Sequence, residues 1–405
     1  MKLTYTTGDL AEWRKLFSVQ ITPLANNTPN SEYVEDALAA LSQIKPQLSP
    51  ALSQLLQLNA YLFVLEHLIQ QAGTQINNSV YFRGYHTVNA AEDMVQVMKT
   101  MLNLPFALAD EPENWGFITD TLTYLRQNML LEKGHTKYFS TIYQLFWMNW
   151  LHPQLLDNQA MYLEELQQLA TAEAELGNSL SRLPWMLAQC WMYFYLVQDQ
   201  KAWTLLRGMN GSIPIHYNEL FQFLRMLYKS EEWLRLKGWL IEVAPLLNNN
   251  RGNILNEYKL FWDAVIVQLP DAEQPMLATL MDMLPYSRHI YGETLLAYGK
   301  YQLWMDYQLS IGNEPLEFRV TVFKPLEKDA PEVLLPFYHQ AVERYVLLKN
   351  RPSYKSAVKL LKRLAKLYKK MKQEARWEQF LTAFAERHSR LRALQEELRK
   401  GKLLS

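Results

Sequence analysis

The residues of this sequence that are best placed to do chemistry are cationic and lie near the C-terminus. Residues 351–405 contain 16 Lys/Arg and 5 Asp/Glu, whereas residues 1–350 contain 25 Lys/Arg and 36 Asp/Glu. Cations at helical spacing can follow a phosphate backbone, which gives affinity without sequence readout. They can equally dock on the acidic body of this chain, bind an acidic partner, or face only solvent. The candidate residues for binding phosphate or an acidic partner are Lys355, Lys359, Lys362, Arg363, Lys366, Lys369 and Lys370.

The rest of the chain shows no catalytic machinery. The sequence contains no G-x-G-x-x-G, no G-x-x-x-x-G-K-[ST] and no H-E-x-x-H motif. The eight histidines are scattered, and His339 with Glu343 is either a hydrogen-bonded pair or half of a metal-ligand set, of which we favour the first. Cys190 is the single cysteine, so it forms no intrachain disulfide, and an apolar helix around it is typical of a buried small hydrophobe. We therefore expect no enzyme, no catalytic residue, no cofactor and no metal.

Two other groups of residues have a functional and a structural interpretation. The acidic segment Asp110–Glu113 lacks the ligand spacing of a calcium loop and is interpreted as a solvated turn. Aromatic residues recur at helical spacing, where they can form a stacking groove but more often fill a core. They are Phe146, Trp147, Trp150, Trp185, Trp191, Tyr193, Phe194 and Tyr195.

Two amphipathic helices are predicted to position the cationic residues, with a break near Gln373–Ala375. Apolar side chains at spacings of three and four predict one buried stripe on each helix. The stripes are Leu360, Leu361, Leu364, Leu367, Tyr368 and Met371, then Trp377, Phe380, Leu381, Phe384, Leu391, Leu394 and Leu398. His388 is expected to be exposed, and Gly401 is expected to cap the second helix at its C-terminal end.

The remainder of the sequence is also predicted to be mostly helical. Only 14 of 405 residues are glycine, and helix-forming residues dominate. One continuous helix is expected over 288–310, and Asp9 is expected to cap the first helix. The exceptions are Val80–Tyr85, which suits a short strand or an extended connection, and Leu316–Lys324, whose alternation suits an extended segment.

The pattern of helices predicts an all-α fold, an elongated array of helix-turn-helix hairpins similar to a tetratricopeptide-like α-solenoid. Trp203 and Trp233 each follow a polar turn and lie 30 residues apart, which is close to the length of such a hairpin repeat. Three regions are expected: an N-terminal helical region over 1–105, a central hairpin array over 106–330 and a basic C-terminal helical region over 331–405.

No segment of the sequence suits a membrane. The longest apolar run, Pro184–Val197, falls short of the roughly 20 residues that span a bilayer. Polar residues follow Met1 closely, so no secretory signal is expected. We expect a cytoplasmic protein with no membrane contact.

The basic C-terminal region also resembles a known family. Leu334–Lys370, Arg376–Phe380 and Arg390–Leu404 are similar to the C-terminal helical region of bacterial SWIM zinc-finger proteins, and Phe146–Leu156 with the helical run after it is similar more weakly. The resemblance implies a setting linked to Swi/Snf-type helicases, in which the SWIM module binds DNA or protein. With one cysteine this chain cannot build the Cys-x-Cys…Cys-x-His zinc cluster, so the zinc and its ligands do not carry over. A stand-alone paralogue, or one piece of a split system with a separate zinc-finger chain, fits this departure.

These observations predict a non-enzymatic helical scaffold. It would bind a protein partner, such as a Swi/Snf-type helicase or a separate zinc-finger chain, in a system associated with nucleic acid. The alternative is a nucleic-acid-binding protein that contacts phosphates through its basic C-terminal helices.

Overall fold

The computed structural model describes residues 10–74, 80–106, 114–132, 137–155, 158–208, 215–247 and 254–404. Every regular element within these ranges is helical, which confirms the all-α fold class. The chain divides into two compact units, Met1–Pro214 and Ile215–Ser405. The three regions expected from the sequence stay a prediction.

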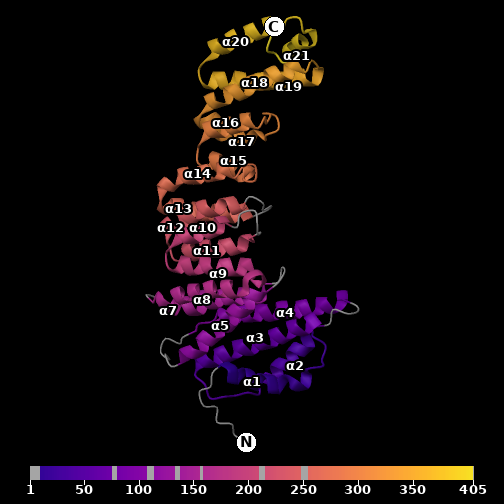
Figure 1. Ribbon diagram of the computed structural model, residues 1–405. Coiled ribbons are helices and arrows are strands. Elements are labelled where there is room, and N and C mark those ends of the chain that lie inside the picture. The colour runs from indigo at the N-terminus through magenta and orange to yellow at the C-terminus, as the bar shows by residue number, and fades with distance from the viewer. Residues whose placement is uncertain are drawn as a thin grey trace. The chain divides into compact units, whose positions relative to one another are not determined.

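The first unit is built from helices that pack against their neighbours along the chain (Figure 1). Its interior is lined by aliphatic side chains of α3 and by the aromatic residues that follow α6. The elements are α1 Leu10–Ile21, η1 Thr22–Leu24, α2 Ser31–Leu41, α3 Pro50–Thr74, α4 Val80–Leu102, α5 Trp115–Leu131, α6 Tyr138–Leu145, the π-helical η3 Phe146–Leu151, α7 His152–Leu155, α8 Ala160–Leu176, η4 Gly177–Ser179, α9 Arg182–Tyr195 and α10 Asp199–Gly208.

The second unit repeats this arrangement, and its C-terminal part carries the basic residues. Helices α18 and α19 form its most extensive pair and lie side by side (Figure 1). The elements are α11 Tyr217–Lys229, α12 Trp233–Val243, η5 Ala244–Leu247, α13 Ile254–Gln268, η6 Pro270–Ala272, α14 Glu273–Asp282, α15 Arg288–Ala297, α16 Tyr301–Ser310, α17 Val320–Asp329, η7 Pro331–Val333, α18 Leu334–Leu347, α19 Arg351–Lys370, α20 Glu374–Arg387 and α21 Arg392–Lys400.

One type of tight turn recurs between helices of the described chain. A residue with positive φ ends one helix, and the next helix begins two residues later, at Val197, Glu231, Gly299, Lys349 and Lys372. At four of these turns the next N–H donates to the carbonyl five residues back, for example Gln198 N to Tyr193 O at 2.8 Å. This is the Schellman arrangement, which satisfies the carbonyls at a helix end.

The turn is coupled to a buried side chain five residues after the positive-φ residue. Ala202, Leu236, Trp304 and Tyr354 occupy this position and are buried, and Trp377 occupies it and packs on a tyrosine of α19. Turns at Val197 and Glu231 are 34 residues apart, and the turn at Gly299 follows after twice that spacing, whereas the turns at Lys349 and Lys372 do not keep this spacing. A period of 34 residues is that of tetratricopeptide hairpins. The helical hairpin is therefore the repeating unit of the fold.

Of two segments expected to be extended, one is helical and the other is helical in its second half, so the first prediction was wrong and the second was wrong in part. Val80–Tyr85 belongs to α4, and the second half of Leu316–Lys324 begins α17. In the latter, the alternating Val320 is 53% exposed, whereas the residues at helical spacing, Phe323 and Leu326, are fully buried. The apolar residues at a spacing of three are the ones that become buried, so this spacing, and not the short period-two alternation, agrees with the observed helix.

Two segments expected to be continuous helices are interrupted. Residues 288–310 form α15 and α16, which separate where Gly299 takes a φ of 66°. The second basic helix is also two helices, α20 and α21. The side-chain amide of Gln395 donates to the carbonyls of Ala385 and His388, which satisfies part of the freed backbone at this break. The expected Asp9 cap and the segment Asp110–Glu113 lie outside the described residues.

No helix in the described ranges combines the length and the apolar character needed to cross a membrane.

Candidate nucleic-acid interface

Helix α19 is held in a fixed position by its N-terminal cap and by one apolar face. The side chain of Asn350 accepts the N–H of Ser353 at 2.9 Å, and a proline occupies the first turn, where its missing N–H costs nothing. The apolar face is fully buried at Leu360, Leu361 and Leu364. It packs on α18, α20 and α21, so the predicted stripe is confirmed as the buried side of this helix.

The opposite side of α19 is cationic and exposed. Helix α19 contains eight Lys/Arg and no Asp/Glu. Lys355, Lys359, Lys362, Lys366 and Lys369 are all exposed, and we call these five residues the basic face. Spacings of three and four place successive lysines about 5–6 Å apart, over about 21 Å of helix. Within the described part of the chain no ion-pair partner contacts any of the five.

Two of the seven candidate residues have a structural role instead. Arg363 is only half exposed and lies beside Tyr338 of α18. Burial raises the pKa of that tyrosine to about 12, and the guanidinium opposes the shift. The amine of Lys370 donates to the main-chain carbonyl of Glu327 near the end of α17, where a helix presents unsatisfied carbonyls and favours a cation. The basic face is therefore smaller than the set expected from the sequence.

An ion pair joins the first turn of α19 to α21. Arg351 Nε lies 2.9 Å from Glu397 Oε1, and Arg351 Nη2 lies 2.5 Å from Glu396 Oε2. The hydrogen bond from Arg351 holds the pKa of the Glu397 carboxyl below its usual value. The positive charge of Arg351 is thus neutralised locally, and the charge of Lys355 also acts on Glu397. Lys359, Lys362, Lys366 and Lys369 have no ion pair among the described residues.

The expected His339–Glu343 hydrogen bond is replaced by two separate contacts. The Nε2 of His339 lies 3.0 Å from the hydroxyl of Tyr368, and Glu343 contacts Arg387 at 3.1 Å and His388 at 3.3 Å. Burial lowers the pKa of His339, and the nearby guanidinium of α20 lowers it further. Both histidines therefore help to fasten α20 onto α18 and α19. The expectation of an exposed His388 was wrong, since only 15% of its side chain is accessible.

The end of α21 uses Gly401 for a different reason from the one expected. Its φ of −71° is available to any residue, and the positive φ falls on Lys402. A Cβ added at Gly401 would lie 2.6 Å from Val358 Cγ1 of α19. The glycine is needed for the close approach of α21 to α19, not for the conformation of a cap.

The aromatic clusters and the cysteine belong mainly to the core. Phe146, Trp147 and Trp150 are at most 1% exposed, and Phe106 stacks on Trp150 with a centroid distance of 4.2 Å. Cys190 is also fully buried, and burial raises the pKa of its thiol. A stacking groove is not formed by these buried rings. No cluster of three or more His, Cys, Asp or Glu suited to a metal occurs in the described ranges.

A buried ionic network in the first unit was not predicted from the sequence. Arg126 of α5 and Glu165 of α8 form an ion pair of 2.9 Å, and the hydroxyl of Tyr143 of α6 donates to the same carboxylate at 2.8 Å. Only 2% of the Glu165 side chain is accessible. Burial raises the pKa of Glu165, and Arg126 acts against the shift. The network joins three helices and has no exposed face, so its role is structural.

Part of the chain is similar to a protein of a bacterium. The chain is 32% identical over 194 residues to YwqB, an uncharacterised protein of Bacillus subtilis strain 168. The match covers 45% of this chain and 36% of that relative, so the shared region spans about a third of the relative's length. No protein-family model matches the chain. No solved structure matches it either.

Proposed function

We propose that this protein is a non-enzymatic helical scaffold that holds nucleic acid through the basic face of α19. The observation that carries the proposal is a row of five exposed lysines on a well-anchored helix, with no described carboxylate paired to them. Unpaired cations on an exposed helix face are available to bind the phosphates of a nucleic acid.

The geometry of the basic face suits a phosphate backbone better than a single anion. Its lysines recur at spacings of three and four along one side of the helix, so they extend along a line and do not surround one point. Lysine acts as a flexible point charge, which tolerates many phosphate positions and reads no sequence. We therefore expect binding without strong sequence preference, with a Kd of about 10⁻⁴–10⁻⁶ M at physiological salt.

A protein partner is the second candidate, and exposed aliphatic side chains favour it. Leu234 and Ile241 lie seven residues apart on α12 and are 70% and 41% exposed, and Leu260 and Val267 lie seven apart on α13 and are 67% and 75% exposed. Because seven residues is about two helical turns, each pair lies on one side of its helix. Exposed aliphatic side chains that recur on one side of a helix are typical of a contact surface when they form a patch. A Swi/Snf-type helicase or a separate zinc-finger chain would be the partner in the helicase-linked setting proposed for this scaffold.

Direct binding measurements test the proposal. Fluorescence anisotropy with labelled single-stranded DNA, duplex DNA and RNA at low salt would compare three proteins: the intact chain, Lys359/Lys362/Lys366/Lys369→Glu, and Lys15/Lys99/Lys201/Lys229→Glu. The two variants carry the same change in net charge, but the second leaves the basic face intact. The control variant therefore distinguishes a loss of affinity caused by the basic face from a loss caused by the lower net charge of the protein.

The proposal predicts that the intact chain and the control variant bind, whereas the α19 variant loses at least tenfold in affinity. Circular dichroism should show the same helix content in the intact chain and the α19 variant, because every substituted position of α19 is exposed. Equal losses in the two variants would contradict a specific role for α19. If none of the three proteins binds at low salt, the nucleic-acid function fails.

A further inference from the structure

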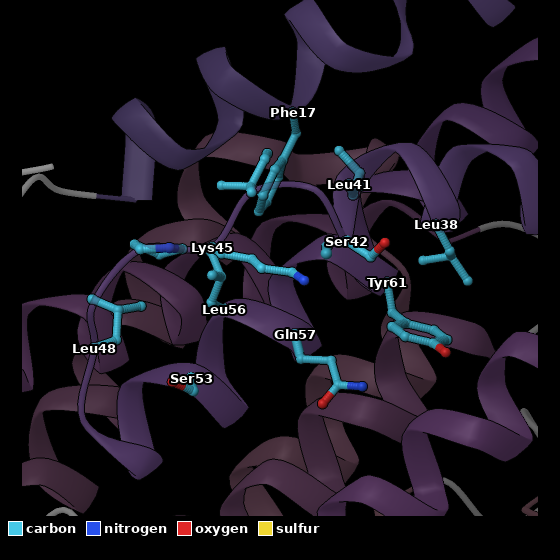
Figure 2. A pocket seen from close by; sticks show the side chains of 13 residues that line it. Phe17, Leu38, Leu41, Ser42, Lys45, Leu48, Ser53, Leu56, Gln57 and Tyr61 are labelled. Atoms are coloured by element: carbon cyan, nitrogen blue, oxygen red, sulfur yellow. The ribbon is translucent and has the colours of Figure 1, made fainter. Parts of the chain in front are cut away.

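The first unit contains a pocket that the proposed scaffold function does not use. It has a volume of about 450 Å³, within the range of small-molecule sites. Helices α1, α2 and α3 and the segment 42–49 line it, and its polar side opens to solvent, where Ser42, Lys45 and Gln57 are exposed (Figure 2). Its lining residues include Phe17, Leu38, Lys45, Leu56, Gln57 and Ala60.

One part of the pocket is apolar. Phe17 is 1% exposed and Leu41 is 5% exposed, so both belong to the core of the unit as well as to the pocket wall. Leu38 of α2 and Leu56 of α3 extend this apolar surface and are themselves half-buried. Such a surface gains free energy when an alkyl chain displaces its water, at about 25 cal/mol per Å² of apolar area buried.

The other part of the pocket is polar and carries one cation. Figure 2 shows the amine of Lys45 directed into the space between Ser42, Gln57 and Tyr61. The lining contains no Asp or Glu, and no ion pair to Lys45 occurs within the described residues. A single ammonium beside an apolar wall, with hydroxyl and amide groups around it, complements a molecule that has an alkyl body and an anionic end.

We propose that this pocket binds an aliphatic carboxylic acid. The alkyl chain lies between α2 and α3, against Phe17, Leu38 and Leu56, and the carboxylate lies beside Lys45. The carboxylate can accept from the Lys45 ammonium and from the side-chain amide of Gln57. A cationic or neutral molecule of the same length lacks the charge match, and the exposed ammonium of Lys45 then keeps only its water.

Isothermal titration calorimetry on the full chain tests this site with decanoate, decylamine, 1-decanol and acetate, each below its aggregation concentration. The site predicts saturable one-to-one binding of decanoate with a Kd below about 1 mM. Decylamine should bind at least tenfold more weakly, because its ammonium would face that of Lys45. Acetate should not bind detectably, because it has almost no apolar surface to bury.

Substitutions of residues that line the pocket test whether the ligand binds there. Lys45→Gln should weaken decanoate by roughly three- to fivefold, the effect of an exposed charge pair, and leave 1-decanol unchanged. Ala60→Phe places a ring in the open space and should reduce the binding of both molecules at least tenfold. Leu56→Gln, a second variant of the apolar wall, should also weaken both. Lys15→Gln on the exposed side of α1 is the matched control and should bind as the intact chain does.

Three results of these titrations bear directly on the proposed site. A lack of saturable decanoate binding, or equal affinities for decanoate and decylamine, would overturn the proposal. So would an unchanged affinity in both Ala60→Phe and Leu56→Gln, provided that thermal unfolding shows the two variants to be folded. Because the site lies in the first unit and the basic face lies in the second, failure here leaves the nucleic-acid proposal unaffected.

Discussion

The buried pair Arg126–Glu165 gives a prediction whose size follows from its surroundings. Substitution of Arg126 by Met removes the cation and leaves the Glu165 carboxylate with only 2% of its side chain accessible. The remaining partner is the hydroxyl of Tyr143, which stabilises a carboxylate less than a guanidinium does. Breaking a buried pair on one side costs about 3–5 kcal/mol, which is a large part of the stability of an ordinary domain. We expect Arg126→Met to lower the free energy of unfolding by that amount at pH 7.

The pH dependence of this loss has a defined sign. Burial already raises the pKa of Glu165 in the intact protein, and removal of the guanidinium raises it further. A carboxyl whose folded pKa exceeds its unfolded pKa binds protons more readily in the folded state, so folding gains stability as the pH falls through the folded pKa. The difference between Arg126→Met and the intact protein should therefore shrink between pH 7 and pH 5.

Urea unfolding followed by circular dichroism measures both effects. The triple variant Arg126→Met/Tyr143→Phe/Glu165→Leu replaces the network by apolar groups and should be as stable as the intact chain or more so. Arg182→Met is the matched control, because it breaks an ion pair whose side chains are 47% and 40% exposed and should cost less than about 1 kcal/mol. A single-variant loss below 1 kcal/mol at pH 7, or a loss that stays constant down to pH 5, would refute the reasoning.

Three further substitutions test the turns and the docking of α21. Val197→Gly should raise the free energy of unfolding by about 0.5–1 kcal/mol in urea titrations. A β-branched residue at φ 57° is strained by about 1–2 kcal/mol, and glycine removes this strain. Part of the gain is offset because glycine loses more conformational entropy on folding than valine does. Gly299→Val, the reverse change at φ 66°, should lower it by a similar amount, and a gain in stability there would contradict the account of the turn. Gly401→Ala should cost about 1–3 kcal/mol, because the new Cβ would meet Val358, and amide exchange in α21 should accelerate while exchange in α18 is unchanged.

The amphipathic character of α19 could be predicted because it is a local property. Lys359, Lys362 and Lys366 alternate with Leu360, Leu361 and Leu364 at helical spacing, and one helix suffices to separate them into two faces. The roles of Arg363 and Lys370 could not be predicted in the same way. Each depends on a contact with a neighbouring helix, α18 for the arginine and α17 for the lysine, and such contacts leave no periodic trace in the sequence.

The recurring turn was not predicted from the sequence because most of its positive-φ positions are not glycine. Four of the five positive-φ positions are Val197, Glu231, Lys349 and Lys372, and only the fifth is a glycine. The spacing of tryptophans indicated a hairpin repeat, but the spacing of 34 residues between the turns at Val197 and Glu231 emerges only from the backbone conformation. The one sequence feature that accompanies the turn is a small or apolar residue five positions after the positive-φ residue. Such residues also occur throughout the helices, so they do not locate the turn by themselves.

The buried network and the pocket were beyond sequence reasoning for a common reason. Arg126 and Glu165 are 39 residues apart, and the pocket brings Phe17 together with Lys45 and Tyr61. Neither arrangement is specified by a motif, since each is produced by the packing of three helices. Expectations drawn from local periodicity therefore described single helices well and described contacts between helices poorly.

The most direct test of the scaffold proposal is the salt dependence of DNA binding by the intact chain. If four lysines of the basic face contact phosphates, the logarithm of the binding constant should fall against the logarithm of salt concentration with a slope of about −3 to −4. That slope corresponds to a loss of roughly a hundredfold between 50 and 200 mM salt. It should become markedly shallower in Lys359/Lys362/Lys366/Lys369→Glu and stay unchanged in Lys15/Lys99/Lys201/Lys229→Glu. An equal slope in the intact chain and in the α19 variant would show that the basic face does not contact phosphate.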